Sequence, residues 1–162
     1  KAVEQGPEFI HLARRLGDCY WYRSQQPNEA IQAYQNYLGL YPNEPRALQG
    51  LAECLKDCGD FSRASNYFRQ LSEVQPDNWR AWYNRIYCAI EDDLFQKAES
   101  DLQLARKQFS DKADLFQLSS FLTLRQRKLD DALSFINQAI QLDPSQTDWL
   151  IDKAQILREL HA

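Results

Sequence analysis

The chain has 162 residues, of which 44% are hydrophobic and 26% are charged, and its formal net charge is -4. This composition is too apolar for a disordered chain, and no apolar run approaches the ~20 residues that a membrane-spanning helix needs. The acidic balance argues against nucleic-acid binding by bulk electrostatics. Only five glycines are present, and none follows Gly59. A sheet protein would need more turn glycines, so helices are expected.

Residue types recur along the chain with a spacing of 34. Pro42 and Pro76 are one period apart, and Pro144 follows Pro76 by two periods. The same spacing relates four alanines, Ala30, Ala64, Ala98 and Ala132. A fixed period of this length is the signature of stacked supersecondary units.

Residues 45–78 show the content of one unit. Pro45 suits the first turn of a helix, and Gly59 suits the residue just past a helix end. Between them, apolar residues follow helical i, i+3, i+4, i+7 spacing at Leu48, Leu51, Ala52 and Leu55. A second stripe after Gly59 consists of Ala64, Phe68 and Leu71. The unit is therefore predicted to be helix, tight turn, helix and short loop.

This pattern resembles the tetratricopeptide repeat family, whose motif is a 34-residue helical hairpin. The resemblance implies an all-α fold, an α-solenoid of stacked antiparallel helix hairpins in a right-handed superhelix. It divides the chain into the tail of a preceding repeat at 1–9, four repeats at 10–44, 45–78, 79–112 and 113–146, and a capping helix at 147–162. In the last helix, Leu150, Ala154 and Leu157 are expected to face inward. We expect these residues to form one continuous domain within a chain that extends further at its N-terminus.

Two repeats depart from the family motif at the same place. Positions 7 and 8 carry Arg85 and Ile86 in the unit 79–112, and Ser119 and Ser120 in the unit 113–146. Ser110 also stands where the other units have their proline. The four units are nevertheless in register, so the resemblance extends over nearly the whole chain.

The resemblance places a partner-binding groove on the first helix of each repeat, at positions 2, 5, 9, 12 and 13. These spacings put the residues on the helix face opposite the packing positions. The expected groove residues are Arg14, Trp21, Tyr22, Arg46, Gln49, Glu53, Arg80, Tyr83, Tyr87, Asp114, Gln117, Phe121 and Arg125. Aromatic and arginine side chains are the usual strong contacts at interfaces. The alternative is that they are scattered side chains on a solvated face.

More specific family functions find little support in the sequence. The carboxylate clamp of chaperone-binding members would need Lys, Asn, Asn, Lys and Arg where this chain has Arg14, Asp18, Gly50, Arg80 and Asn84. The basic run at 124–128 closes a first helix, where cations offset the helix dipole, so this reading is favoured over a phosphate contact. No nucleotide-binding, zinc-protease or hydrolase motif is present, and His11 and His161 lie near opposite ends. We expect neither catalysis nor a cofactor.

The cysteines follow the same register. Cys19, Cys54 and Cys88 share position 10, where Leu122 and Ile156 continue the series. This predicts core packing for Cys54, with a redox or metal role as the alternative. Cys58 is left unexplained. Core thiols without disulfide partners favour a cytoplasmic location.

The sequence thus predicts a non-catalytic interaction module that binds a protein or peptide. The alternatives are a targeting or regulatory array of a larger enzyme, and a chaperone or assembly factor for secretion or envelope machinery. We expect neither binding to nucleic acid nor a membrane span. We do expect that the protein can self-associate through the exposed ends of the array.

Overall fold

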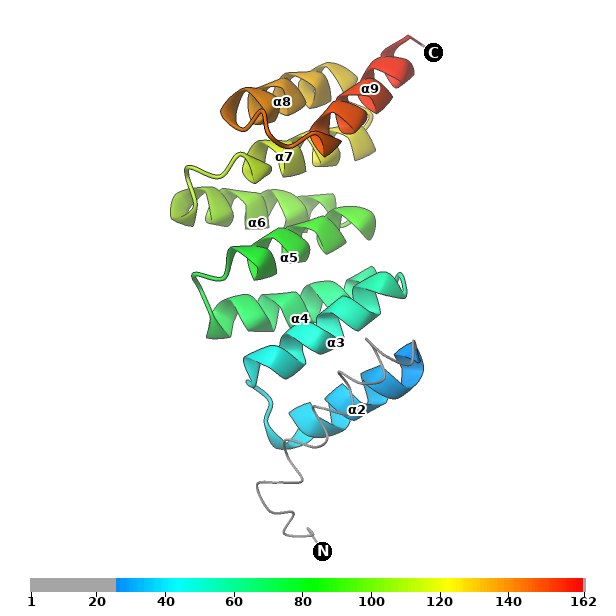
Figure 1. Ribbon diagram of the computed structural model, residues 1–162, viewed down its shortest axis with the longest axis vertical. Helices are drawn as coiled ribbons and strands as arrows, with labels where there is room; N and C mark the ends of the chain where they lie inside the picture. The colour runs from blue at the N-terminus through cyan, green and yellow to red at the C-terminus, as the bar shows by residue number, and fades with distance from the viewer. Residues whose placement is uncertain (1–25, 162) are drawn as a thin grey trace, which may run out of the picture. The chain divides into compact units, whose positions relative to one another are not determined.

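The computed structural model describes residues 26–161, and every regular element in this range is a helix (Figure 1). The helices are α2 (Pro27–Leu40), α3 (Pro45–Asp57), α4 (Phe61–Val74), α5 (Trp79–Glu91), α6 (Phe95–Gln108), α7 (Asp114–Arg125), α8 (Leu129–Leu142) and α9 (Asp148–Leu160). The expected all-α fold is confirmed for this part of the chain. The first helix expected in the unit 10–44 lies outside the described residues.

The chain divides into two compact units, Lys1–Ala81 and Trp82–Ala162, and α5 begins in the first and continues in the second. In the described part of the first unit, α3 packs against both α2 and α4. The predicted apolar stripes of both helices are confirmed, because their side chains are at most 1% exposed: Leu48, Leu51, Ala52, Leu55, Ala64, Phe68 and Leu71.

In the second unit α7 packs against α6 and α8, and α8 packs against α9. The apolar core between α8 and α9 contains Ile136, Trp149 and Ile156. The expected inward face of α9 was therefore wrong, because Leu150 is 52% exposed and Ala154 is also exposed. Leu157 is only half-buried.

The orientation of α9 depends on which of its faces a neighbouring helix covers. Leu150 and Ala154 occupy the register of Leu48 and Ala52, which belong to the hairpin of α3 and α4. No second hairpin helix follows α9 among the residues that the structure describes. Packing on α8 instead buries the face that carries Trp149 and Ile156.

The turns inside the three described hairpins, α3–α4, α5–α6 and α7–α8, have the same backbone form. Gly59, Asp93 and Arg127, each 34 residues apart, have positive φ angles of 80°, 55° and 63°. At the first turn, the N–H of Gly59 donates to the Lys56 carbonyl, and the N–H of Asp60 donates to the Leu55 carbonyl. Equivalent pairs of bonds occur at the other two turns, so each first helix ends in a Schellman motif. The prediction for Gly59 is confirmed, although two of the three turns use a side-chain-bearing residue.

An ion pair lies inside the α5–α6 hairpin. The Arg85 side chain, 11% exposed, pairs with Asp101, which is 5% exposed, and Arg85 Nε lies 2.8 Å from Asp101 Oδ2. The guanidinium also lies 4.8 Å from the Trp82 ring centroid, where a cation–π contact is favourable. Arg85 stands at position 7 of its repeat, where the unit 45–78 has Leu51. Asp101 supplies the opposite charge that this replacement requires.

Candidate interaction pocket

Three aromatic rings form a continuous stack on the first helices of the second unit. The rings of Tyr83 and Tyr87, one turn apart on α5, have centroids 6.4 Å apart and planes inclined by 8°. The ring of Tyr87 then stacks on that of Phe121 from α7, with centroids 5.5 Å apart and planes inclined by 17°. All three rings are half-buried, so part of the stack remains accessible. Position 9 of two successive repeats thus forms one aromatic surface.

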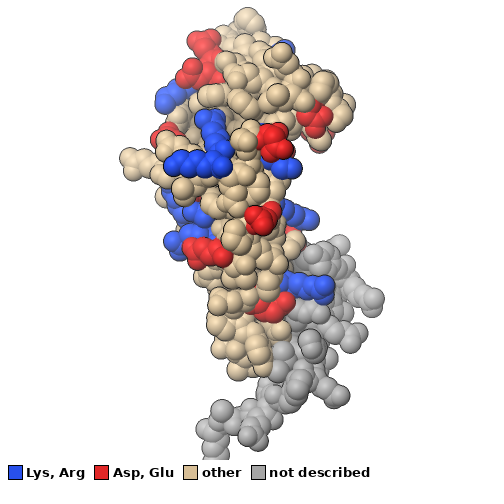
Figure 2. Space-filling model, turned by 90° about the vertical axis from the view of Figure 1, so that its left-hand side faces the viewer, with Lys and Arg blue, Asp and Glu red and all other residues tan. Residues whose placement is uncertain are grey.

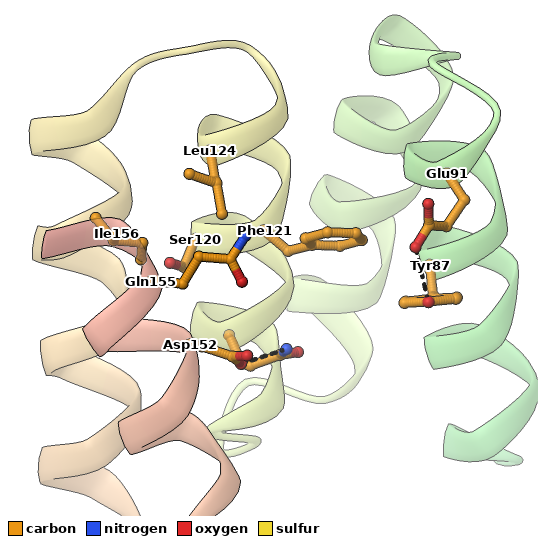
Figure 3. Close-up of a pocket in the computed structure, with 9 residues that line it drawn as sticks. Tyr87, Glu91, Ser120, Phe121, Leu124, Asp152, Gln155 and Ile156 are labelled. Atoms are coloured by element: carbon orange, nitrogen blue, oxygen red, sulfur yellow. Dashed lines mark hydrogen bonds between the residues drawn. The ribbon is translucent and has the colours of Figure 1, made fainter. Parts of the chain in front are cut away.

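Beside this stack lies a hollow of about 220 Å³ between α5, α7 and α9 (Figure 3). We call it the Tyr87–Phe121 pocket, and it is lined by Tyr87, Glu91, Gln117, Ser120, Phe121, Leu124, Asp152, Gln155 and Ile156. This volume is smaller than that of a typical pocket for a small-molecule ligand, about 300–1,000 Å³, and suits a single amino-acid side chain better.

Two hydrogen bonds connect α5, α7 and α9. The Tyr83 hydroxyl donates to Gln117 Oε1 over 3.1 Å, and Gln117 Nε2 donates to Asp152 Oδ2 over 3.3 Å. Burial raises the pKa of Tyr83 to about 12, and the charges of Asp114 and Asp152 contribute to this rise. The phenol is therefore neutral at physiological pH, and a negative potential surrounds it.

The two carboxylates of the pocket are partnered differently. Glu91 accepts from the Tyr87 hydroxyl over 2.7 Å and from Arg125 Nη1 over 2.8 Å. Arg125 also donates to Asp93 over 2.7 Å, which holds its guanidinium at the Glu91 end. Asp152 accepts only from the neutral Gln117 amide and has no cationic partner among the described residues. Burial, followed by the bond to Glu91, raises the pKa of the Tyr87 hydroxyl.

The structure places the expected groove residues in separate groups. The second unit gathers five of them around the aromatic stack: Tyr83, Tyr87, Gln117, Phe121 and Arg125. Asp114, on the first turn of α7, contributes through its charge near Tyr83.

The first unit holds another group of the expected residues. Glu53 accepts from Gln49 Nε2 over 3.0 Å and pairs with Arg80 over 2.9 Å, and Arg46 is exposed. Arg14, Trp21 and Tyr22 lie outside the described residues.

Two charged residues of the pocket were missing from the expected set. Glu91 occupies the same register position as Arg125, and its opposite charge was a readable signal for their pairing. Asp152 stands at position 6, which is not among the positions used to predict the groove. Asp152 lines the pocket and accepts a hydrogen bond from Gln117 of α7.

The buried cysteines lie apart from this pocket. Cys54 and Cys88 are both free and fully buried, which confirms the predicted core role of Cys54. Burial raises the pKa of the Cys54 thiol to about 12, and the neighbouring Cys58 adds to the rise. Cys58 itself is free and exposed. Within residues 26–161, no three His, Cys, Asp or Glu side chains are placed to hold a metal ion.

The surface shows charges of both signs. Figure 2 shows basic and acidic side chains interspersed among uncharged ones on the face that it draws. Arginines of the basic run at 124–128 are held in ion pairs, Arg125 with Glu91 and Asp93, and Arg127 with Glu159. These ion pairs favour a structural role for the basic run over a phosphate contact. None of the described helices combines the length and apolarity that crossing a bilayer requires.

Comparison with known proteins finds a family match over part of the chain. Residues 22–84 match the family described as tetratricopeptide repeat. Among solved structures, MamA from Desulfovibrio magneticus RS-1 is similar with a TM-score of 0.74 and 19% identity, over 95% of this chain and 86% of that one. A tetratricopeptide repeat protein from Parabacteroides merdae gives a TM-score of 0.85 and 18% identity, over 96% of this chain and 60% of that one.

A further similar structure is that of the Cut9–Hcn1 hetero-tetramer of the APC/C, with a TM-score of 0.69 and 14% identity, over 91% of this chain and 30% of that one. At these identities the likeness shows the fold alone. No curated protein matches the chain in sequence.

Proposed function

We propose that the protein is a non-catalytic interaction module that binds a segment of a partner protein, because residues 22–84 match the tetratricopeptide repeat family. The binding surface is the aromatic stack of Tyr83, Tyr87 and Phe121 together with the pocket beside it. The fold supplies the scaffold, and the specific surface comes from residues that this chain places on its first helices.

The stack of Tyr87 on Phe121 is the observation that carries this proposal. Covering the remaining surface of this half-exposed aromatic pair would remove a large apolar area from water. Aromatic side chains are also enriched among the residues that dominate binding energies at protein interfaces. The surrounding hydrogen bonds hold the rings in place before a partner arrives, which lowers the ordering cost of binding.

Partner capture with matched variants tests this function. The intact chain, a Tyr87→Ala/Phe121→Ala double variant and a Tyr41→Ala control would be used as baits. Tyr41 is 39% exposed and lies outside the pocket, so its removal takes away an aromatic ring without touching the site. We expect the double variant to lose partners that the wild type and the control both retain. Equal capture by all three folded proteins, with folding checked by circular dichroism, would refute the proposal.

The wider roles considered for such an array remain proposals of the same kind. A targeting or regulatory array of a larger enzyme, and an assembly factor for secretion or envelope machinery, would both use this surface. The identities of the captured partners separate these roles. The buried free thiols of Cys54 and Cys88 favour a reducing compartment such as the cytoplasm, which thiol labelling of protein from intact cells would test.

Self-association is a second proposal, favoured by the exposed apolar residues of α9. Leu150 is 52% exposed and Ile151 is 69% exposed, and the two are adjacent on the helix. Covering them in a second copy would remove this apolar area from water. Sedimentation at increasing concentrations should show an oligomer that a Leu150→Ser/Ile151→Ser variant lacks, whereas a monomer at all concentrations would exclude it.

A further inference from the structure

We propose that the Tyr87–Phe121 pocket binds a lysine or arginine side chain of the partner, with Asp152 as its counter-ion. This inference rests on the proposed interaction function and specifies what the pocket recognises. It follows from the charges, the ring faces and the size of the hollow.

Of the two carboxylates that line the pocket, only Glu91 has a cationic partner among the described residues. Glu91 and Asp152 both line it, and Glu91 has both carboxylate oxygens occupied by Tyr87 and Arg125. Asp152 accepts a single hydrogen bond, from a neutral amide. A carboxylate that keeps free acceptor positions beside an apolar wall favours a cationic donor, because charge-assisted hydrogen bonds are about twice as strong as neutral ones.

The chain itself shows how a cation fits this surface. Arg125 reaches Glu91 across one repeat and takes up the negative charge at that end of the pocket. No described residue does the same for Asp152, which belongs to the next first helix in the series. The pocket therefore has one carboxylate neutralised from within and a second that can be neutralised by a partner.

The aromatic faces favour the same ligand. Phe121 extends from α7 toward Tyr87 of α5, and the two stacked rings both line the pocket (Figure 3). The face of an aromatic ring attracts a cation within about 6 Å of its centroid. The aliphatic stem of a lysine or arginine can meanwhile lie against Leu124 and Ile156, with its charged end at Asp152.

The size and the wider charge distribution support a side chain over other ligands. A volume of about 220 Å³ holds one side chain but is small for a cofactor. Asp114 and Asp152 both contribute a negative potential at Tyr83, so an anionic group would meet repulsion there. The expected occupant of the pocket is therefore a partner segment that carries a basic residue among apolar ones.

A peptide selection with the full chain as bait tests this inference. A phage library of random heptapeptides would be selected against the wild type, and one enriched peptide would be synthesised with its basic residue and with norleucine in its place. Affinities would be measured by fluorescence anisotropy for wild type, Asp152→Asn and Asp148→Asn. The last is the matched control, because it removes the same charge from the same helix outside the pocket.

We expect enriched peptides to share lysine or arginine at one position. Asp152→Asn should weaken the basic peptide about tenfold, and the loss should shrink at high salt. The norleucine peptide should bind the wild type more weakly by a similar factor. It should bind the wild type and Asp152→Asn with equal affinity. Asp148→Asn should behave as wild type.

Each other outcome is decisive. Enriched peptides without a basic position, or equal binding of the basic peptide to wild type and Asp152→Asn, would overturn this inference. If those peptides still required Tyr87 and Phe121, the proposed interaction function would stand without it. Enrichment of no peptide at all would count against both.

Discussion

Arg85 of α5 and Asp101 of α6 form an ion pair inside one hairpin, at register positions where the unit 45–78 has Leu51 and Tyr67. Leu51 holds the place of Arg85 in the unit 45–78, and Tyr67 and Phe135 hold the place of Asp101 in two other units. Both members of the pair are almost fully enclosed. The unit 79–112 thus has two opposite charges where the unit 45–78 has a leucine and a tyrosine.

We predict that the two charges depend on each other for stability. Arg85→Leu or Asp101→Leu alone should lower the free energy of unfolding by about 3–5 kcal/mol, because each leaves an unpaired buried charge. The double variant should recover most of this loss, since an apolar pair leaves no buried charge without a partner. Urea unfolding of the four proteins gives the coupling energy, and single variants that cost less than about 1 kcal/mol would contradict the prediction.

A second prediction concerns the close approach of α3 to α2. A Cβ atom at Gly50 would lie 2.5 Å from Tyr34 Cζ, and the Tyr34 side chain is fully buried and has little room to move. Gly50→Ala should therefore lower the free energy of unfolding by about 1–3 kcal/mol, despite the better helix propensity of alanine. Gly39→Ala is the matched control, because nothing lies within 4 Å of its added Cβ. Thermal unfolding should show a lower Tm for the first variant only.

A third prediction concerns the three left-handed turn residues. Arg127 adopts a φ of 63°, a conformation that costs a side-chain-bearing residue about 1–2 kcal/mol. Its ion pair with Glu159 is exposed and contributes little in return, since the Arg127 side chain is 77% exposed. Arg127→Gly should raise the free energy of unfolding by about 1 kcal/mol. Arg63→Gly within α4 should instead lower it by a similar amount, and stabilisation by neither or both would contradict this explanation.

A fourth prediction concerns the cysteines. The exposed Cys58 thiol should react with iodoacetamide in the native protein, whereas the buried Cys54 and Cys88 should react only after unfolding. Peptide mapping by mass spectrometry reports each cysteine separately. Rapid native alkylation of Cys54 would contradict its burial.

The Cys54 pKa also predicts a pH dependence of stability. Its ordinary value of 9.0 rises to about 12 in the fold, chiefly through burial. Between these values the unfolded chain loses the thiol proton while the folded chain keeps it, so the free energy of unfolding falls as pH rises above 9. Cys54→Ala should show a shallower decline between pH 9 and 11 in urea titrations. Parallel curves for the two proteins would exclude this contribution.

The fold could be read from the sequence because its information is periodic. The buried stripes of α3 and α4 follow directly from Leu48, Leu51, Phe68 and Leu71, since apolar spacing reports the packed face of a helix. The same logic failed on α9. Periodicity identifies an apolar face but does not say which neighbouring helix covers it, so Leu150 was assigned inward when α8 buries Trp149 instead.

The candidate site was only partly predictable for a related reason. The positions of Tyr87 and Phe121 follow from the register, and so does their adjacency across one repeat. The roles of Asp152 and Glu91 depend on how long side chains bridge neighbouring helices. Those contacts require the separation and tilt of the helices, which a one-dimensional pattern does not contain.

The Tyr87–Phe121 pocket draws its walls from three successive first helices, so no single hairpin can form it. In a repeat array, stability is a sum of terms within each repeat and terms between neighbours. A ligand that touches α5, α7 and α9 adds to the terms between neighbours alone. Binding should therefore reinforce the array mechanically. Under load the occupied protein would resist separation of α5, α7 and α9, and release of the partner would accompany their separation.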